Sequence, residues 1–383
     1  MTSRGKAYSG ARIHDGRRLV SGHSVLLSKD EGCRIVPDAE VPSAYEVVTL
    51  QEGVITPGFV DLQVNGGGGV LFNDAPSVDA LRAIANAHQG LGTAAFLPTL
   101  ITDSPTTTRA AIDAIEAAVA ERVPGIIGLH LEGPHLSVAR KGAHDGALIR
   151  SMTDDDMALL IDAIERLPNL MVTVAPESVT LDQMRRLSDA GVILSLGHTD
   201  ADRATCHAAF DAGVRCVTHL FNAMSQFGSR EPGLVGATLE REDIYAGLIA
   251  DAVHVHPASI RIALAAKPRS DRVFLVTDAM APAGSDIDRF VLSGRDVFRK
   301  DGRLMLADGT LAGADLDMAT ALDVMVGQVG DSLEQAVTRA TATPTAFLRE
   351  RQGVGVIDAS TRWVNYLPPT GQMGAVRTQL LNE

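Results

Sequence analysis

Aromatic residues, cysteines and basic charge are all scarce in this chain of 383 residues. Phe, Trp and Tyr make up only 4%, so the core is expected to consist of Ala, Val, Leu and Ile. The three cysteines, Cys33, Cys206 and Cys216, form no C-x-x-C pair and no even disulfide framework, which is typical of the reducing cytosol. Lys and Arg number 34 against 47 Asp and Glu, and the net charge of −13 disfavours binding to nucleic acid or an anionic membrane.

Long apolar runs are missing from the sequence as well. No run approaches the roughly 18 residues of a membrane span, and residues 1–6 lack the apolar stretch of a signal peptide. The 45% of hydrophobic and 21% of charged residues are ordinary values for a globular protein. We therefore expect a globular cytoplasmic protein that binds neither nucleic acid nor a membrane.

From residue 59 onward, short apolar runs alternate with helical segments. Runs of five to eight residues of this kind predict buried parallel strands. The predicted strands are Phe59–Val64, Ala94–Leu100, Gly125–Leu131, Leu170–Ala175, Val192–Leu196, Cys216–Phe221, Tyr245–Ala250 and Val273–Thr277. Eight such units over about 220 residues match the size of a (β/α)8 barrel, and a doubly wound open sheet is the structural alternative.

Both ends of the chain have a different pattern. Residues 1–56 and 353–383 contain short apolar runs broken by Gly, Pro and Asp, which indicates short strands. Phe290–Leu311 alternates like a hairpin, with Asp301-Gly302 as its turn. We predict an α/β protein with a TIM-like barrel at residues 57–350 and a small β-sandwich domain formed from residues 1–56 and 351–383.

Chemically active residues follow several of the predicted strands, where a barrel carries its site. Glu132 follows the third strand, His198 the fifth, and His219 lies in the sixth. Three N and O ligands with an open position are what a hydrolytic zinc-like site needs. Neutral, hydrogen-bonded histidines are the structural alternative. The glycine run Gly66–Gly69 is a weak phosphate signal, since it lacks the Lys-Ser/Thr of a P-loop.

Asp278 ends the eighth predicted strand. It could be a helix N-cap, but Pro282 and Gly284 argue against a helix there. A carboxylate without a structural task at the rim is a candidate general acid or base.

Six motifs in this order resemble the N-acetylglucosamine-6-phosphate deacetylases of the amidohydrolase superfamily. The motifs are Pro57–Gly69, His130–Pro134, Gly197–Thr199, Thr218–Met224, Arg230–Gly233 and Leu275–Ala279, and the resemblance runs from residue 54 to residue 345. The resemblance implies hydrolysis of an acetamide to acetate and glucosamine 6-phosphate. It also implies that Glu132, His198 and His219 bind a divalent metal; zinc suits this ligand set best, and Fe or Mn also fits it.

The resemblance further implies roles for other residues. Asp278 is expected to be the acid/base, and His144 to face the acetyl carbonyl. His254 and the backbone around Asn222 and Ala223 are expected to meet the sugar phosphate. Arg230 is expected to reach the phosphate of a neighbouring subunit, which requires at least a homodimer.

Two departures from the family pattern are visible. Gln63 and Asn65 stand where many amidohydrolases have His-x-His, so we expect one metal ion instead of two, with both amides among the substrate-binding residues. The C-terminal part, with Thr343–Thr345 and Val354–Asp358, also differs from the usual pattern. This difference affects the expected packing of the small domain and not the expected chemistry.

Two other functions fit parts of the sequence. A cyclic-amide hydrolase of the same superfamily needs His-x-His and a lysine after the fourth strand, where this chain has Thr173–Glu177. A non-catalytic sugar-phosphate-binding protein would keep Arg230 and His254 but would not need Asp278 and the three metal ligands. The deacetylase is therefore the preferred hypothesis.

Overall fold

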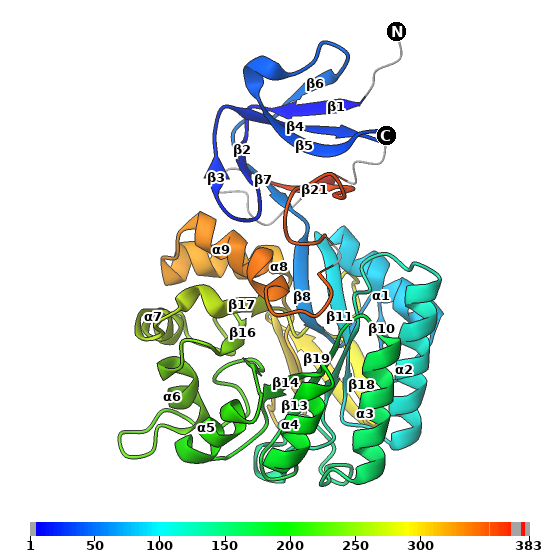
Figure 1. Cartoon of the computed structure of the whole chain (residues 1–383), viewed down its shortest axis with the longest axis vertical. Coiled ribbons are helices and arrows are strands. Elements are labelled where there is room, and N and C mark those ends of the chain that lie inside the picture. Colours follow the sequence, from blue (N-terminus) through cyan, green and yellow to red (C-terminus); the bar gives the residue numbers. More distant parts are fainter. Residues whose placement is uncertain (1–4, 352, 369–376, 380–383) are drawn as a thin grey trace.

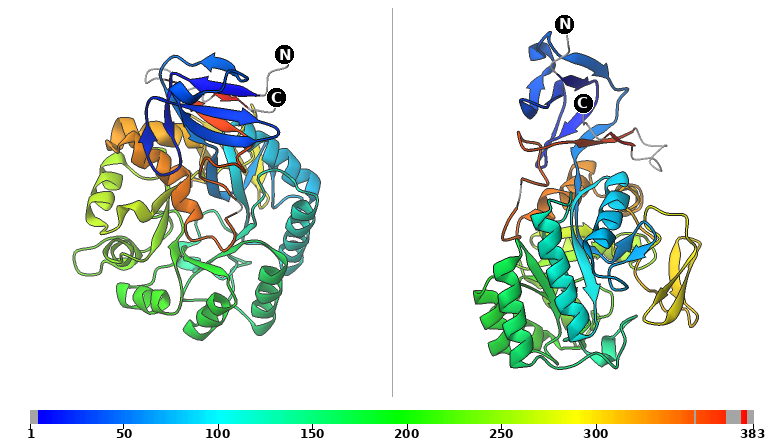
Figure 2. Two further views of the ribbon diagram at one scale, coloured as in Figure 1. Left: turned by 45° about the horizontal axis from the view of Figure 1, so that its top comes forward. Right: turned by 90° about the vertical axis from the view of Figure 1, so that its right-hand side faces the viewer.

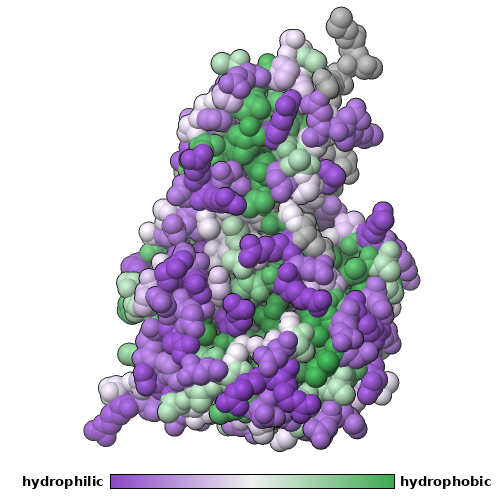
Figure 3. Space-filling model, viewed as in Figure 1, coloured by the Kyte–Doolittle hydropathy of each residue, from purple (hydrophilic) through white to green (hydrophobic). Residues whose placement is uncertain are grey.

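The computed structural model describes residues 5–351, 353–368 and 377–379. Figure 1 shows a barrel of strands and helices with a small β domain at one end. Among the described helices, none is both long and apolar enough to cross a membrane. On the face shown in Figure 3, hydrophilic residues cover most of the surface, and hydrophobic residues are visible between them on the small domain.

Eight parallel strands form the barrel. In chain order they are β8 (Phe59–Val64), β11 (Thr93–Ile101), β12 (Leu129–Glu132), β13 (Leu170–Val174), β14 (Ile193–Leu196), β15 (Cys216–Val217), β16 (Tyr245–Ile249) and β17 (Val273–Val276), and each pairs with the next. The first and last strands meet just past their carboxyl ends, where the Asp278 amide donates to the Gln63 carbonyl at 3.0 Å and the Asn65 amide to that of Ala279 at 2.9 Å. This closure confirms the barrel and excludes the open sheet.

Helices follow most of the strands on the outside of the barrel (Figure 2). They are α1 (Val78–Gly90), α2 (Pro105–Ala120), α3 (Asp154–Arg166), α4 (Leu181–Asp189), α5 (Arg203–Asp211), α6 (Gly233–Glu240), α7 (Pro257–Ala266), α8 (Met318–Asp323), α9 (Leu333–Ala340) and α10 (Ala342–Thr345). A π-helical turn (Val324–Val329) follows α8, and short 3₁₀ turns occupy Asp38–Glu40, Val138–Arg140 and Ser270–Arg272. Side chains cap several helix starts, among them Ser77, Thr153 and Asp202.

Two sheets make up the small domain. One has the order β5-β4-β1-β6 and the other β22-β21-β7-β2-β3. Their strands are β1 (Lys6–Ser9), β2 (Arg12–His14), β3 (Leu19–Val20), β4 (His23–Ser28), β5 (Gly32–Pro37), β6 (Glu46–Thr49), β7 (Val54–Pro57), β21 (Val364–Leu367) and β22 (Arg377–Gln379). Since β21 pairs with β7, the two chain ends share one small β domain, as the sequence predicts.

A separate three-stranded sheet extends from the side of the barrel (Figure 2, right). It contains β18 (Arg289–Leu292), β19 (Arg295–Lys300) and β20 (Arg303–Leu306), all antiparallel. Asp301 and Gly302 form the predicted turn with φ of 52° and 70°, the left-handed pair that a two-residue hairpin favours. The sheet packs on Leu71, Ile101 and Met280, so it supports the loops after β8, β11 and β17.

The structure differs from the predicted strands mainly at β12, which begins at Leu129 and not at Gly125, and at β15. The apolar run Cys216–Phe221 predicts six residues, but the strand ends at Val217. The reason is the backbone that follows, where His219 and Phe221 have φ of 30° and 81°. Residues in the left-handed conformation cannot continue a strand. After β8, the chain forms a short antiparallel hairpin of β9 (Gly66–Gly67) and β10 (Val70–Leu71).

Candidate active site

Three side chains from neighbouring strand ends converge inside the barrel mouth. Glu132 ends β12, and His198 and His219 each follow their strand by two residues. Glu132 Oε1 lies 3.2 Å from His198 Nε2 and 3.0 Å from His219 Nε2, and the two Nε2 atoms are 3.1 Å apart. All three residues are at most 4% exposed. We call them the ligand cluster, because their facing atoms could hold a metal ion.

The donor set fits a divalent metal. His198 Nδ1 lies 2.9 Å from the Arg140 carbonyl, which can only accept, so Nδ1 carries the proton and the lone pair on Nε2 faces the cluster. Ligand atoms around tetrahedral zinc stand about 3.3 Å apart, given bonds of about 2.0–2.1 Å. The observed separations of 3.0–3.2 Å are close to that spacing. Two imidazole nitrogens and a carboxylate oxygen that face one another would be held together by a divalent cation between them.

The charges within the cluster shift its ionisation equilibria. Burial opposes the charge on Glu132, but the neighbouring His198 and His219 hold the pKa of this carboxyl well below its usual value. Burial likewise opposes the charged form of His219, yet Glu132 raises the pKa of this imidazole. The carboxylate and the imidazoles therefore stabilise each other in a site that water hardly reaches.

Asp278 lies beside the ligand cluster and is held by two amide side chains. Asn65 Nδ2 donates to Asp278 Oδ1 at 2.7 Å. Gln63 Nε2 lies 3.2 Å from the same oxygen and 3.1 Å from Glu132 Oε1. Burial, and then the charge of Glu132, raise the pKa of Asp278. The side chains of Gln63 and Asn65 therefore face carboxylates beside the ligand cluster.

His144 completes the buried group. It is 4% exposed, its Nε2 lies 3.7 Å from Glu132 Oε2, and its ring centre is 4.4 Å from that of His198. The loop that carries it is fixed at both ends, because Arg140 holds His198 through its carbonyl and Arg295 of β19 donates to the Ala143 carbonyl. The alternative of a solvent-exposed His144 is therefore excluded.

The other expected site residues lie in the loops after β15 and β16. Asn222 and Ala223 follow His219 in a tight turn, in which the Asn222 amide donates to the His219 carbonyl at 2.9 Å. His254 Nδ1 lies 2.6 Å from Asp251 Oδ2 in the loop after β16. Arg230 lies exposed in the loop before α6, and in the part of the chain described here no hydrogen bond or ion pair joins it to the ligand cluster.

Sequence reasoning missed two buried residues of this region. Thr102, just past β11, contacts His144, with its Oγ1 2.8 Å from His144 Nδ1. Asp61 of β8 accepts a hydrogen bond of 2.5 Å from the hydroxyl of Thr277, the residue before Asp278. Both signals were available, since Thr102 lies two residues past the predicted strand Ala94–Leu100 and Asp61 is a carboxylate within the predicted strand Phe59–Val64.

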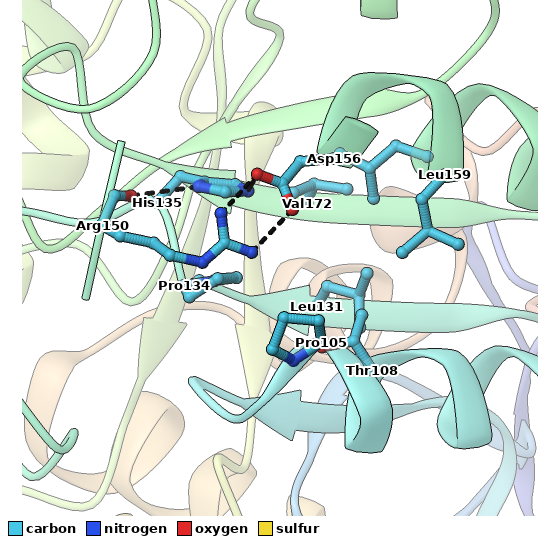
Figure 4. Close-up of a pocket in the computed structure, with 11 residues that line it drawn as sticks. Pro105, Thr108, Leu131, Pro134, His135, Arg150, Asp156, Leu159 and Val172 are labelled. Carbon is cyan, nitrogen blue, oxygen red and sulfur yellow. Dashed lines mark hydrogen bonds and ion pairs between the residues drawn. The ribbon is translucent and has the colours of Figure 1, made fainter. Parts of the chain in front are cut away.

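A small enclosed pocket lies close to this region but on the other side of β12 (Figure 4). Leu131 and Val172 line it, and their neighbours in sequence, Glu132 and Thr173, point the opposite way into the barrel. Arg150 forms a bidentate pair with Asp156 there. This pocket belongs to the packing of α2 and α3 on the barrel and is separate from the ligand cluster.

Comparisons with known proteins agree with this geometry. The model of the amidohydrolase family matches residues 54–360. An N-acetylgalactosamine-6-phosphate deacetylase of a Shewanella species is 45% identical, over 79% of this chain and 76% of its own length. An N-acetylglucosamine-6-phosphate deacetylase of Haemophilus influenzae is 34% identical, over 85% and 84%.

A solved structure extends the similarity to the whole fold. The crystal structure of N-acetylglucosamine-6-phosphate deacetylase from Pasteurella multocida superposes with a TM-score of 0.91 at 31% identity, and the match covers 98% of each chain. Both the barrel and the small β domain are therefore shared with that enzyme. The protein belongs to the amidohydrolase family of metal-dependent hydrolases.

Proposed function

We propose that this protein hydrolyses the acetamide of N-acetylglucosamine 6-phosphate to acetate and glucosamine 6-phosphate. The observation that carries the proposal is the buried ligand cluster, with Asp278 on one side and His144 on the other. Relatives named as deacetylases of 6-phosphorylated N-acetylhexosamines support it.

One divalent ion, zinc by preference and Fe or Mn as alternatives, is proposed for Glu132, His198 and His219. Such an ion lowers the pKa of water and polarises a carbonyl oxygen. A second ion would need imidazoles in place of Gln63 and Asn65, whose amide N–H groups instead donate to Asp278.

The chain's own residues supply the proton transfers that an amide requires. The carbonyl group of an amide is a weak electrophile and the amine is a poor leaving group, so both groups must be activated. Asp278 takes a proton from the attacking water and later delivers it to the departing amine. Its raised pKa, caused by burial and by Glu132, suits a group that must both accept and give up a proton. His144 Nε2 donates a hydrogen bond to the acetyl oxygen as negative charge develops there.

Recognition of the phosphate is proposed to involve two subunits. His254 and the Asn222-Ala223 turn lie on the rim of the same subunit, whereas Arg230 reaches the phosphate of a neighbouring one. The loop that carries Arg230 projects beyond α5 and α6 (Figure 1), and it also exposes 67% of Phe227. A guanidinium suits phosphate oxygens, and an exposed aromatic next to it suits a dimer interface.

A second substrate is supported by a specific observation. Two relatives are named for N-acetylgalactosamine 6-phosphate, one from Shewanella at 45% identity and one from Escherichia coli O157:H7 at 34%. The relatives from Haemophilus influenzae, Bos taurus, Bacillus subtilis and Rattus norvegicus are named for the glucosamine isomer and are 32–35% identical. The two sugars differ only in the configuration at C4, so both carry the acetamide at C2 and the phosphate on O6. We propose that this protein also accepts the galactosamine isomer. A cyclic amide is disfavoured, because β13 is followed by Ala175, Pro176 and Glu177 and not by a lysine.

Two further features are proposed with this function. The cysteines Cys33, Cys206 and Cys216 are all free and buried, and free thiols are typical of the reducing cytoplasm. Burial raises the pKa of each thiol to about 12. The catalytic unit is proposed as residues 57–350, with 1–56 and 351–383 as the two parts of the small domain.

The test is acetate release from four sugars, namely N-acetylglucosamine and N-acetylgalactosamine, each with and without 6-phosphate. We expect both 6-phosphates to react and the free sugars to have a kcat/KM lower by about 10²-fold or more, because binding energy from the remote phosphate positions the amide. Equal kcat/KM with and without phosphate would overturn the phosphate assignment. No acetate from any of the four would overturn the deacetylase itself.

A further inference from the structure

Thr102 makes two contacts with one nitrogen of His144. Its hydroxyl oxygen lies 2.8 Å from His144 Nδ1, and its backbone N–H donates to the same atom at 3.3 Å. Thr102 is the first residue after β11 and is buried, whereas His144 lies in the long loop after β12. These contacts therefore connect two loops that are 42 residues apart in sequence.

The hydrogen bonds determine which nitrogen of His144 carries the proton. A backbone N–H can only donate, so Nδ1 must be the acceptor. A neutral imidazole has one N–H, which must then be on Nε2. Nε2 is the atom that faces the ligand cluster, 3.7 Å from Glu132 Oε2. His144 accordingly presents a donor toward the place where the substrate amide must bind.

Close packing fixes Thr102 in this position. A side chain on Gly133 would place its Cβ 2.3 Å from Thr102 Oγ1, so only glycine leaves room for the threonine. Gly133 also has a φ of 93°, a conformation that other residues rarely adopt. The Thr102 hydroxyl can donate to His144 Nδ1 at 2.8 Å or to the Glu132 carbonyl at 3.3 Å, and the shorter distance favours the histidine.

We propose that Thr102 is a positioning residue that holds His144 with its proton on Nε2, so that His144 can donate to the substrate carbonyl oxygen. The proposal rests on the deacetylase function. A donor of this kind strengthens its bond as charge develops on the oxygen, so its orientation acts on kcat more than on KM.

The kinetic test uses Thr102→Val, which keeps the shape and the backbone N–H but removes the hydroxyl. We expect kcat to fall about fivefold, since one hydrogen bond contributes about 1 kcal/mol and 1.4 kcal/mol is tenfold, with KM unchanged within about twofold. Thr102→Ser restores the hydroxyl and should recover most of kcat. Thr56→Val is the matched control, because this buried threonine of β7 donates only to the Pro57 carbonyl and should leave kcat unchanged.

The second readout is independent of turnover. In the zinc-loaded full-length chain with ¹⁵N-labelled histidine, the nitrogen shifts of His144 should show an unprotonated Nδ1 and a protonated Nε2. Thr102→Val keeps the longer backbone contact of 3.3 Å but loses the hydroxyl contact of 2.8 Å, so part of the population should shift to the tautomer protonated on Nδ1. A wild-type protein protonated on Nδ1 would overturn the proposal, and so would an unchanged kcat in Thr102→Val. A wild-type protein that is inactive on all N-acetylhexosamine 6-phosphates would instead contradict the proposed function, whereas the tautomer measurement would still decide the role of Thr102.

Discussion

His198, His219 and Asp278 share an uncommon backbone conformation. Their φ angles are 49°, 30° and 53°, in the left-handed region that costs a residue with a side chain roughly 1–2 kcal/mol. Each follows the end of a barrel strand, where the chain must turn sharply to direct a side chain into the mouth. Residues held in such conformations cluster at active sites, because the surrounding contacts compensate for the strain.

At Asp278 those contacts make a specific prediction possible. Asp278→Asn keeps an oxygen that can accept from Asn65 and Gln63, so the ligand cluster should stay intact and bind its metal. Asparagine cannot shuttle a proton, and kcat should fall by about 10²–10⁴-fold. Metal content by mass spectrometry and acetate release measure the two effects on the same sample.

The result can contradict this role in two ways. A variant that keeps more than about a tenth of wild-type kcat would mean that another group is the base. A variant that loses its metal would mean that Asp278 supports the ion, and the loss of activity would then say nothing of proton transfer. Asn65→Ala is a useful companion, since it removes the 2.7 Å contact and leaves the carboxylate in place.

Single residues also mark the limit of what the sequence could predict about the site. Glu132, His198, His219 and Asp278 stand at strand ends, and a barrel brings strand ends together whatever its loops do. The Thr102–His144 contact depends on how a loop of several residues folds back over a neighbouring strand. No periodicity encodes that path, so only the three-dimensional structure reveals it.

At the scale of elements, a belt of hydrogen bonds crosses the barrel interior below the ligand cluster. His130 of β12 contacts Thr99 of β11 through Nδ1 at 3.3 Å and Thr173 of β13 through Nε2 at 2.8 Å. The Thr173 hydroxyl lies 2.7 Å from that of Thr218, which in turn lies 2.7 Å from Ser195 Oγ of β14. Each member is buried and paired, as buried polar groups must be.

The belt connects the strands whose ends carry the ligands, and Thr173 is its central member. Thr173→Val should lower the free energy of unfolding by about 1–3 kcal/mol, because it leaves His130 Nε2 and the Thr218 hydroxyl without this partner. Urea denaturation measures the change, and Thr173→Ser should restore most of it. Thr238→Val is the control, since this buried hydroxyl of α6 has a single partner, the Leu234 carbonyl. If Thr173→Val is as stable as the wild type, apolar packing can replace the belt.

Elements differ in how well their sequence predicts them. Runs of buried β-branched and aliphatic residues give the eight strands, because parallel strands are covered on both faces. The same signal overestimates β15, since Leu220 is buried without belonging to a strand. It also predicts the β19–β20 hairpin through Asp301-Gly302, but the packing of that sheet on Leu71 and Met280 depends on contacts distant in sequence.

At the scale of the whole molecule, the small domain and the candidate site lie at opposite ends of β8. The chain passes from β7 of the small domain into β8 and reaches the site only at Gln63 and Asn65 (Figure 1). The small domain is attached at the other end, where the Leu19 amide donates to a Glu334 carboxylate oxygen of α9 at 2.8 Å. The small domain therefore does not cover the rim around the site.

A mixing experiment tests whether a neighbour completes that site. Arg230→Ala should raise KM strongly, because it removes the phosphate contact, and Asp278→Asn should abolish turnover. If Arg230 acts across the interface, each site takes its Asp278 from one chain and its Arg230 from the other. In a mixed dimer, one site then combines an intact Asp278 with an intact Arg230 from its partner, and the other site carries both changes.

The expected recovery follows from the symmetry of a dimer. After subunit exchange at equal concentrations, about half of the dimers are mixed and half of their sites are whole, so activity at low substrate should approach roughly a quarter of wild type. Exchange must be verified independently, for instance with differently labelled subunits, and each variant alone sets the background. If labelled subunits exchange and the mixture is no more active than the mean of the two variants, Arg230 serves its own chain or has no part in binding the phosphate.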